Sequence, residues 1–120
     1  MTKQLKLIQK AGYIHNDIKL ENVLVRQTQE NVVDYDSAIL IDFGLSSRYL
    51  DESGEHIKFQ KVNTFRGNLV FSSKNAFNMD PLSRRDDFIS LAYLLLYLSE
   101  GVSTFLKFDP TSASQTACFE

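Results

Sequence analysis

The apolar residues near the start of the chain recur at the spacing of an amphipathic helix. Leu5, Ile8 and Ala11 are spaced so that they fall on one helical face. Gly12 follows at the place where a residue in the left-handed conformation usually closes a helix. The pattern therefore predicts a helix over residues 3–10.

Two short runs rich in aliphatic and β-branched residues come next. Residues 22–27 read NVLVRQ and residues 37–43 read SAILIDF, with a polar stretch between them. Such runs predict a β-hairpin or a small sheet with one buried face, whose second strand ends at Asp42. Residues 46–73 are polar, contain glycine breakers and show no sustained period, which predicts a long functional loop.

The strongest helical pattern lies late in the chain. Ser83 offers an N-cap, acidic residues occupy the first turn, and Gly101 follows the last apolar turn. The centre of this segment is apolar on every side, so it predicts a buried helix over residues 83–100. Residues 102–120 lose the periodicity and become rich in Ser and Thr, so we expect a poorly ordered tail.

The composition limits the class of protein. A chain of 120 residues provides one small domain with a single core. Its 15 acidic and 13 basic residues nearly balance, so overall charge favours neither a nucleic-acid binder nor a membrane-surface protein. Cys118 is the single cysteine, which excludes an internal disulfide and a cysteine-based zinc site. The longest apolar stretch, residues 88–98, is too short to span a bilayer, and the N-terminus lacks the pattern of a signal peptide. We expect an intracellular protein, cytoplasmic or nuclear, and nothing in the sequence sets its oligomeric state.

A spaced polar motif precedes the predicted hairpin. His15, Asp17, Lys19 and Asn22 read H-x-D-x-K-x-x-N, and Asp42 of I-D-F-G follows across the hairpin. The combination is too specific to be a chance occurrence in a chain of this length. A plain structural interpretation still applies to single members, because a histidine before a turn usually packs and an Asp or Asn in a turn usually caps its own backbone.

Phosphoryl transfer needs the residue types that this motif contains. The reaction requires a carboxylate beside the acceptor hydroxyl, a cation near the transferring oxygens, and oxygen ligands that hold Mg²⁺ against the phosphates. Asp17 and Lys19 supply the first two, and Asn22 with Asp42 supplies the third. Magnesium prefers carboxylate and amide oxygens, which explains why Asp and Asn, rather than Cys or His, occupy these places.

These segments resemble a known family. Residues 15–25 (HNDIKLENVLV) and 41–46 (IDFGLS) resemble the catalytic loop and the magnesium-binding motif of eukaryotic protein kinases, H-R-D-x-x-x-x-N and D-F-G. Residues 83–98 (SRRDDFISLAYLLLYL) resemble the casein kinase 1 family, in which S-R-R-D-D opens the central buried helix of the C-terminal lobe. The resemblance covers about residues 3–101, and S-R-R-D-D is its most specific part.

The resemblance implies a role for each motif residue. Asp17 would be the catalytic base and Lys19 the phosphate-facing cation, while Asn22 and Asp42 would bind Mg²⁺ and thereby ATP. Structural support would come from His15, Gly44 and Asp87.

Asp87 would accept backbone N–H groups of the catalytic loop near His15 and Asn16, although an acid in the first turn of a helix also has a purely structural explanation. Arg84 and Arg85 are either solvated surface charges or ties to the activation segment.

The activation segment carries the remaining predicted residues. The casein kinase 1 family has S-I-N in place of the usual A-P-E that closes this segment, and here Ser73, Lys74 and Asn75 stand at the matching distance before S-R-R-D-D. Gly67 and Asn68 stand where the family has the first two residues of G-T-A-R-Y-A-S. The resemblance therefore implies that Gly67, Asn68, Ser73 and Asn75 belong to the substrate-facing or activation segment.

Several residues depart from the family pattern. Asn16 replaces the arginine that in many kinases pairs with a phosphorylated activation loop, which argues against control by phosphorylation of that loop. Ser47 and Val70 stand where casein kinase 1 relatives carry basic residues that bind phosphate or sulfate, so a preference for pre-phosphorylated substrates is in doubt. Asn68 replaces a threonine, but its amide is able to bridge the base and the lysine.

The predicted fold class is α+β: a fragment of a kinase C-terminal lobe, mostly helical, with a small β-hairpin that carries the catalytic and magnesium-binding loops. Residues 1–101 would form this partial domain. The function expected from the resemblance is ATP-dependent phosphorylation of serine or threonine in a protein substrate, with Mg²⁺, no nucleic acid and no membrane span. No glycine-rich phosphate loop or strand lysine precedes the catalytic loop, so we expect an incomplete form that is inactive on its own. One alternative is a non-catalytic kinase relic or pseudokinase that acts by protein binding. A second alternative is a small-molecule phosphotransferase, but Lys19 and the D-F-G motif argue against it.

Overall fold

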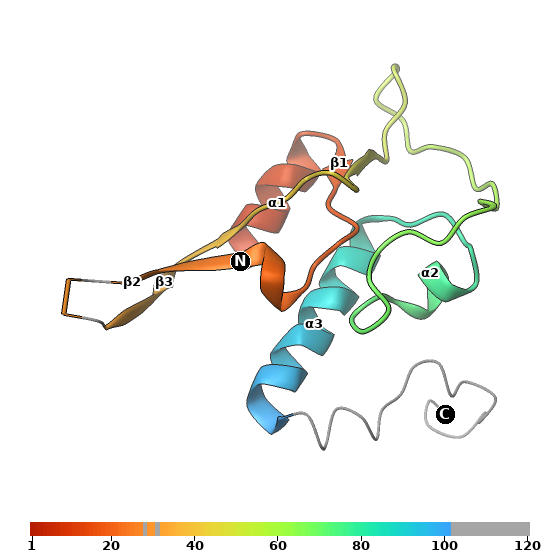
Figure 1. The fold of residues 1–120 in the computed structure, drawn as a ribbon. Coiled ribbons are helices and arrows are strands. Elements are labelled where there is room, and N and C mark those ends of the chain that lie inside the picture. Colours follow the sequence, from red (N-terminus) through yellow and green to blue (C-terminus); the bar gives the residue numbers. More distant parts are fainter. Residues whose placement is uncertain (28, 31, 102–120) are drawn as a thin grey trace.

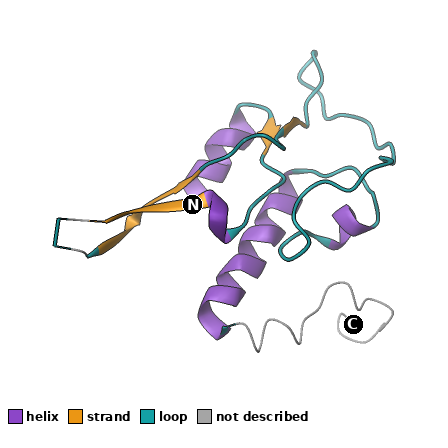
Figure 2. Cartoon of the chain, viewed as in Figure 1, coloured by secondary structure: helices purple, strands orange, loops and turns teal. Residues whose placement is uncertain are grey.

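The computed structural model describes residues 1–27, 29–30 and 32–101. In chain order its elements are α1 (Thr2–Lys10), β1 (Tyr13–Ile14), the 3₁₀ turn η1 (Leu20–Asn22), β2 (Val23–Gln27), β3 (Val33–Leu40), β4 (Ser47–Arg48), α2 (Lys74–Phe77) and α3 (Arg84–Glu100). The β2–β3 hairpin projects to one side of the molecule, the loop between β4 and α2 lies on the other side, and α3 runs between them (Figure 1). Figure 2 shows that loops, drawn in teal, make up a large part of the described chain.

Both predicted helices form, with the ends that the sequence indicates. Helix α1 ends before Gly12, whose φ of 86° lies in the left-handed region that glycine adopts easily. At the start of α3, the carboxylate of Asp86 accepts the backbone N–H of Ser83 over 2.7 Å, which satisfies a group that the first helical turn would otherwise leave unpaired. Gly101, with φ of 77°, follows the last turn of α3.

Within the described residues, helix α3 is buried on one face only. Leu91 and Leu94 are only 6% and 1% exposed, whereas Leu95 and Leu98 are each 56% exposed. The described elements pack against one face of the helix, and the apolar residues of the opposite face remain accessible. None of the helices in the described part of the chain is long and apolar enough to cross a membrane.

Two antiparallel strand pairs form. The predicted hairpin is present as β2 and β3, with Val23 opposite Leu40 and an irregular register between Leu24 and Arg26. A second pair, β1 with β4, joins the residues before the catalytic loop to the predicted long loop, and the sequence pattern did not reveal it. The prediction of a mostly helical fold is also wrong, because α1, α2 and α3 hold only 9, 4 and 17 residues.

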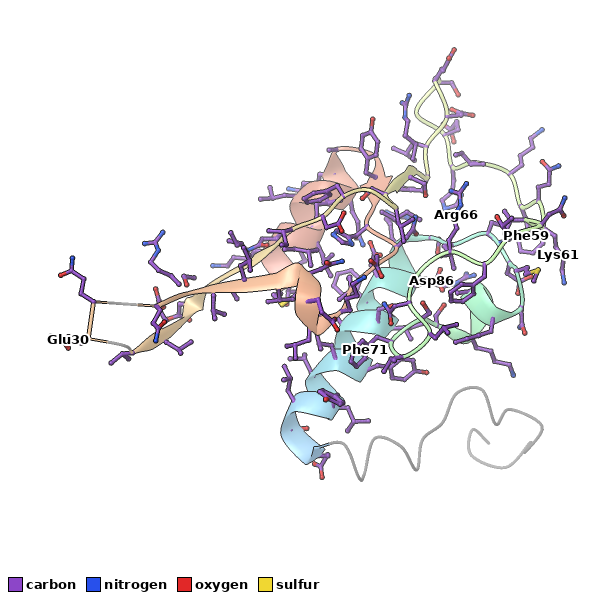
Figure 3. All side chains as sticks on the ribbon, in the orientation of Figure 1. Glu30, Phe59, Lys61, Arg66, Phe71 and Asp86 are labelled. Atoms are coloured by element: carbon purple, nitrogen blue, oxygen red, sulfur yellow. The ribbon has the colours of Figure 1, made fainter. Side chains whose placement is uncertain are left out.

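One small apolar core joins these elements. It receives side chains from α1, the loop after β1, β3, the segment before α2, and α3. The core residues are Leu5, Ile18, Leu40, Phe71, Leu91 and Leu94. Figure 3 shows Phe71 beside α3, where its ring makes an edge contact with that of Tyr97, with the ring centroids 5.6 Å apart. The catalytic loop is thus packed on its apolar side by Ile18, which is fully buried.

Two adjacent leucines of α3 test this arrangement. We expect Leu94→Ala to lower the free energy of unfolding by about 2–5 kcal/mol, because it leaves a cavity in the core. Leu95→Ala removes the same atoms from an exposed position and should change it by about 0.5 kcal/mol or less. Urea unfolding of the two variants measures the difference, and equal losses would contradict the one-sided packing of α3.

Candidate active site

Asp17 lies in the loop between β1 and η1 and is held by two neighbours of the same motif. It is 4% exposed. The ammonium of Lys19 donates to Asp17 Oδ2 over 2.7 Å. Asn22 Nδ2 donates to the same Oδ2 atom over 3.0 Å and to the backbone oxygen of Asp17 over 2.8 Å. Three motif residues therefore form one hydrogen-bonded cluster.

The charges of this cluster stabilise one another. Burial by itself would raise the pKa of the Asp17 carboxyl. Hydrogen bonds from Lys19, Asn68 and Asn22, together with the positive charge of Lys19, outweigh the burial and hold that pKa below its ordinary value. The hydrogen bond to Asp17 in turn raises the pKa of Lys19. Both groups are therefore ionised at neutral pH.

Asp42 lies just beyond the hairpin, and the prediction that it ends the second strand is wrong by two residues. Strand β3 ends at Leu40, and Asp42 has a φ of 61°. Asp and Asn tolerate this left-handed conformation better than most residues, because the short side chain bonds to nearby backbone. Here Asp42 Oδ1 accepts the N–H of Gly44 over 3.1 Å.

Ile41 connects the Asp42 loop to the Asp17 loop. Its N–H donates to the backbone oxygen of Asn22 over 2.9 Å, and its own oxygen lies 3.1 Å from His15 Nε2. The N–H of Asp17 lies 3.3 Å from His15 Nδ1. A carbonyl oxygen only accepts and a backbone N–H only donates, so these contacts require a neutral histidine with its hydrogen on Nε2. His15 therefore holds backbone atoms of both loops.

Asn22 and Asp42 offer the oxygen atoms that a magnesium ion needs. The amide nitrogen of Asn22 is already committed to Asp17, which leaves its amide oxygen for a cation. Asp42 is exposed at the surface. Within the described residues no group of three or more His, Cys, Asp or Glu side chains is placed to hold a metal ion. The donor set therefore fits a site of two protein ligands, of the kind that substrate phosphates and water complete.

Asp87 connects α3 to the catalytic loop. Its carboxylate is 2% exposed and accepts the backbone N–H groups of His15 over 2.8 Å and of Asn16 over 2.9 Å. Burial raises the pKa of Asp87 above its ordinary value, and the two hydrogen bonds act in the opposite direction. The hydrogen bonds expected from the resemblance are present, although the residue also lies in the first turn of its helix.

Comparison with known proteins agrees with this geometry. Residues 1–120 match the family described as the protein kinase domain. The chain belongs to the protein kinase family. It is 38% identical over 116 residues to a casein kinase 1-like protein of Oryza sativa subsp. japonica, covering 95% of this chain and 16% of that protein. It is 33% identical over 103 residues to a probable serine/threonine-protein kinase of Dictyostelium discoideum, covering 84% of this chain and 20% of that protein. The resemblance to casein kinase 1-like serine/threonine kinases is thus confirmed, and the chain spans a fifth or less of these relatives.

Asn16 of this kinase chain does more than replace an arginine. It has a φ of 69° and is 8% exposed. Its side-chain nitrogen donates to the backbone oxygen of Leu45 and to Ser47 Oγ, each over 2.9 Å. Two of the departures from the family pattern, Asn16 and Ser47, therefore bond to each other. The bond joins the catalytic loop directly to the segment after D-F-G.

Asn68 brings the activation segment to the base. Its side-chain nitrogen donates to Asp17 Oδ1 over 3.3 Å and to the backbone oxygen of Ile18 over 3.0 Å. Its side-chain oxygen accepts the N–H of Phe71 over 2.6 Å. Asn68 therefore contacts Asp17 as expected, but the hydrogen bonds of the described residues do not include the expected one to Lys19.

Ser73 and Asn75 face α3 rather than the base. Both donate to Asp86 Oδ1, over 2.6 and 2.7 Å. Figure 3 shows Asp86 where the start of α3 meets α2. The carboxylate that caps α3 thus also anchors the end of the activation segment.

The two arginines of S-R-R-D-D behave differently. The guanidinium of Arg84 lies 5.0 Å from the ring centroid of Tyr49, so it is a tie to the activation segment. The side chain of Arg85 is 61% exposed and lies 3.7 Å from Asp86, so it is mainly a solvated charge.

Two positioning contacts were missed by the sequence analysis. Gln4 of α1 bonds to the backbone of β3 at Ala38 and Leu40. The hydroxyl of Tyr49 donates to the backbone oxygen of Gln9 over 2.6 Å. Gln4 is next to a core position of α1, which is a weak signal, and no local pattern indicates the partner of Tyr49.

Gly67 allows the activation segment to approach the catalytic loop closely. Its φ is +115°, and an added Cβ would meet Ser72 Oγ and lie 2.9 Å from the backbone oxygen of Asn16. Gly54 also has a positive φ, of +82°, but nothing lies within 4 Å of its added Cβ. Both alanine variants incur the cost of the left-handed conformation, of about 1–2 kcal/mol. Only Gly67→Ala adds a clash, which we expect to cost about 1–3 kcal/mol more.

Urea unfolding of Gly67→Ala and Gly54→Ala measures this difference. Equal losses of unfolding free energy in the two variants would contradict the close approach at Gly67.

The lowered pKa of Asp17 gives a pH-dependent contribution to stability. We expect wild type to exceed Asp17→Asn in unfolding free energy at pH 7, and this excess to shrink as the pH falls through the ordinary aspartate pKa of about 3.9. Below that pH the unfolded state binds a proton that folded Asp17 resists, so acid favours unfolding. Both proteins retain Asp87, so its raised pKa cancels in the difference.

The measurement is urea unfolding of both proteins at several pH values between 3 and 7. Asp36→Asn, at an exposed position of β3, serves as the control for a lost charge. An excess stability that grows towards low pH would contradict the assigned hydrogen bonds.

Proposed function

We propose that the full-length protein transfers the γ-phosphoryl group of ATP to serine or threonine hydroxyl groups of protein substrates. The proposal rests mainly on one observation: Ile41 bonds the loop that carries Asp17 to the loop that carries Asp42. Membership of the protein kinase family and the names of the two relatives support the same reaction. We also infer that these residues belong to the C-terminal lobe, where the resembled motifs lie in casein kinase 1 relatives.

Asp17 would act on the acceptor hydroxyl. In this reaction the hydroxyl oxygen forms a bond to the γ-phosphorus, the bond from that phosphorus to the bridging oxygen of ADP breaks, and the hydroxyl proton passes to a base. Because its pKa is lowered, Asp17 is ionised at neutral pH and able to accept a hydrogen bond from the hydroxyl. A carboxylate of this kind orients the nucleophile first and takes the proton late.

Lys19 would neutralise charge on the transferring oxygens. Its side chain is 30% exposed, and the ammonium carries three hydrogens, of which the bond to Asp17 uses one, so others would be able to bond to a phosphate. Asn22 and Asp42 would hold Mg²⁺, which when bound neutralises phosphate charge and orients the phosphates. The base and the metal ligands would then face the same transferring group.

Activation would not require a phosphate on the activation segment. Asn16 already joins the catalytic loop to Leu45 and Ser47 through uncharged hydrogen bonds. Asn68 joins the segment to Asp17 directly. These contacts supply the order that a phosphate–arginine pair supplies in many kinases.

A non-catalytic kinase that acts by protein binding is the second candidate, and the loss of the arginine at Asn16 is the observation that favours it. Measured phosphorylation by the wild-type protein decides between the two. Because the chain covers only 16% and 20% of the two relatives, the full-length protein is the form to assay.

Two aspartates provide the principal test. We expect Asp17→Asn to reduce the rate of phosphate transfer by about 10²–10⁴-fold, because it removes the base. Asp42→Asn should also reduce the rate by orders of magnitude, because it removes a charged magnesium ligand. The assay follows transfer of labelled phosphate from Mg·ATP to casein by the full-length protein.

Asp36→Asn is the matched control, because Asp36 is an exposed aspartate of the same hairpin. It should leave the rate unchanged. Activity close to that of wild type in Asp17→Asn or in Asp42→Asn would refute the assignment.

A further inference from the structure

The outer edge of β3 is paired by a side chain. Among the described residues, the sheet that contains β3 has two strands, and β2 bonds to one edge only. At the other edge, Gln4 Nε2 donates to the backbone oxygen of Ala38 over 2.6 Å. Gln4 Oε1 accepts the backbone N–H of Leu40 over 2.8 Å. A single glutamine from α1 therefore satisfies two backbone groups of this edge.

The amide of Gln4 bonds to β3 as a third strand would. A primary amide carries a donor and an acceptor side by side, as a peptide group does. On β3 the acceptor is the backbone oxygen of Ala38 and the donor is the N–H of Leu40. Only one orientation of the Gln4 amide therefore satisfies both groups. Leu5, the next residue of α1, is fully buried in the same core cluster as Leu40, which fixes the helix from which Gln4 extends.

The pairing ends two residues before Asp42. Leu40 is held by Gln4, and Ile41 is held by Asn22 on its N–H and by His15 on its oxygen. His15 and Asn22 belong to the polar motif. Gln4 belongs to no motif, yet it fixes the backbone that leads directly into the magnesium-binding loop.

We propose that Gln4 is a positioning residue for Asp42, and that it sets how well the site binds the metal–phosphate complex. The inference rests on the proposed function, because Asp42 is there a magnesium ligand. Loss of the amide would leave Asn22 and His15 in place but would release the strand that aligns Asp42 with Asn22. The effect should therefore fall on the metal and the nucleotide rather than on the protein substrate.

The kinetic test uses Gln4→Met in the full-length protein, with Lys3→Met as the matched control at an exposed neighbouring position of α1. We expect the Mg²⁺ concentration for half-maximal rate to rise roughly fivefold or more in Gln4→Met, the effect of losing hydrogen bonds to the strand. The KM for casein should stay unchanged, and Lys3→Met should match wild type. If Gln4 only stabilised the fold, Gln4→Met would reduce the amount of folded protein and so the maximal rate, but the Mg²⁺ concentration for half-maximal rate would stay unchanged. That result would overturn the inference.

A second measurement separates the inference from the proposed function. In the 120-residue chain, we expect the Leu40 amide hydrogen of Gln4→Met to exchange with solvent roughly fivefold faster, because it loses its acceptor. Ile41, which bonds to Asn22, provides the internal reference. If the wild-type protein lacks kinase activity, the proposed function fails. Faster exchange of the Leu40 amide hydrogen in Gln4→Met would still show that Gln4 fixes the backbone of β3. Unchanged exchange at Leu40 would overturn it.

Discussion

The structure depends on one buried carboxylate. Asp87 lies in the first turn of α3 and accepts the N–H groups of two consecutive residues of the catalytic loop, His15 and Asn16. Burial raises the pKa of this carboxyl, and the two hydrogen bonds from the loop act in the opposite direction. The long helix and the loop that carries Asp17 are thereby joined through a contact that bulk water cannot easily replace. The β1–β4 pair and the Ile41 contacts extend from this fixed loop to the segment that carries Asp42.

Two carboxylates of the same region are tuned in opposite directions. Asp87 has a raised pKa because burial dominates. Asp17 has a lowered pKa because Lys19 and two side-chain amides outweigh its burial. The first group bonds to the backbone of the loop, and the second is the proposed catalytic base. The difference follows from the partners, since Asp17 bonds to the positive charge of Lys19 whereas the hydrogen bonds to Asp87 come from backbone N–H groups of the loop.

The sequence alone was sufficient to predict the features that depend on neighbouring residues. The extents of α1 and α3 follow from consecutive residues: the apolar spacing, a capping residue and a terminating glycine. The polar motif was recognisable because phosphoryl transfer requires particular residue types at fixed spacing. Contacts between distant segments were predictable only where the family resemblance supplied them, as for Asp87 and the N–H groups of the loop. The contact of Gln4 with β3 was not predictable, because spacing does not say which remote group a side chain reaches. Which face of α3 is exposed does not follow from its sequence, since an all-apolar helix does not indicate which of its faces is covered.

Asp87 holds the catalytic loop through main-chain atoms. The side chain at position 16 is therefore free to differ without loss of these two hydrogen bonds. Asp87 bonds to the backbone N–H of residue 16 and makes no demand on the side chain there. A change from the arginine of related kinases to Asn16 is therefore compatible with an unchanged loop, provided that the new residue tolerates a positive φ, as asparagine does. An arginine at position 16 would lose the hydrogen bonds that the Asn16 amide donates to Leu45 and Ser47. Positions 16 and 47 are therefore coupled through one hydrogen bond, whereas the bonds of Asp87 to the loop backbone do not depend on either side chain.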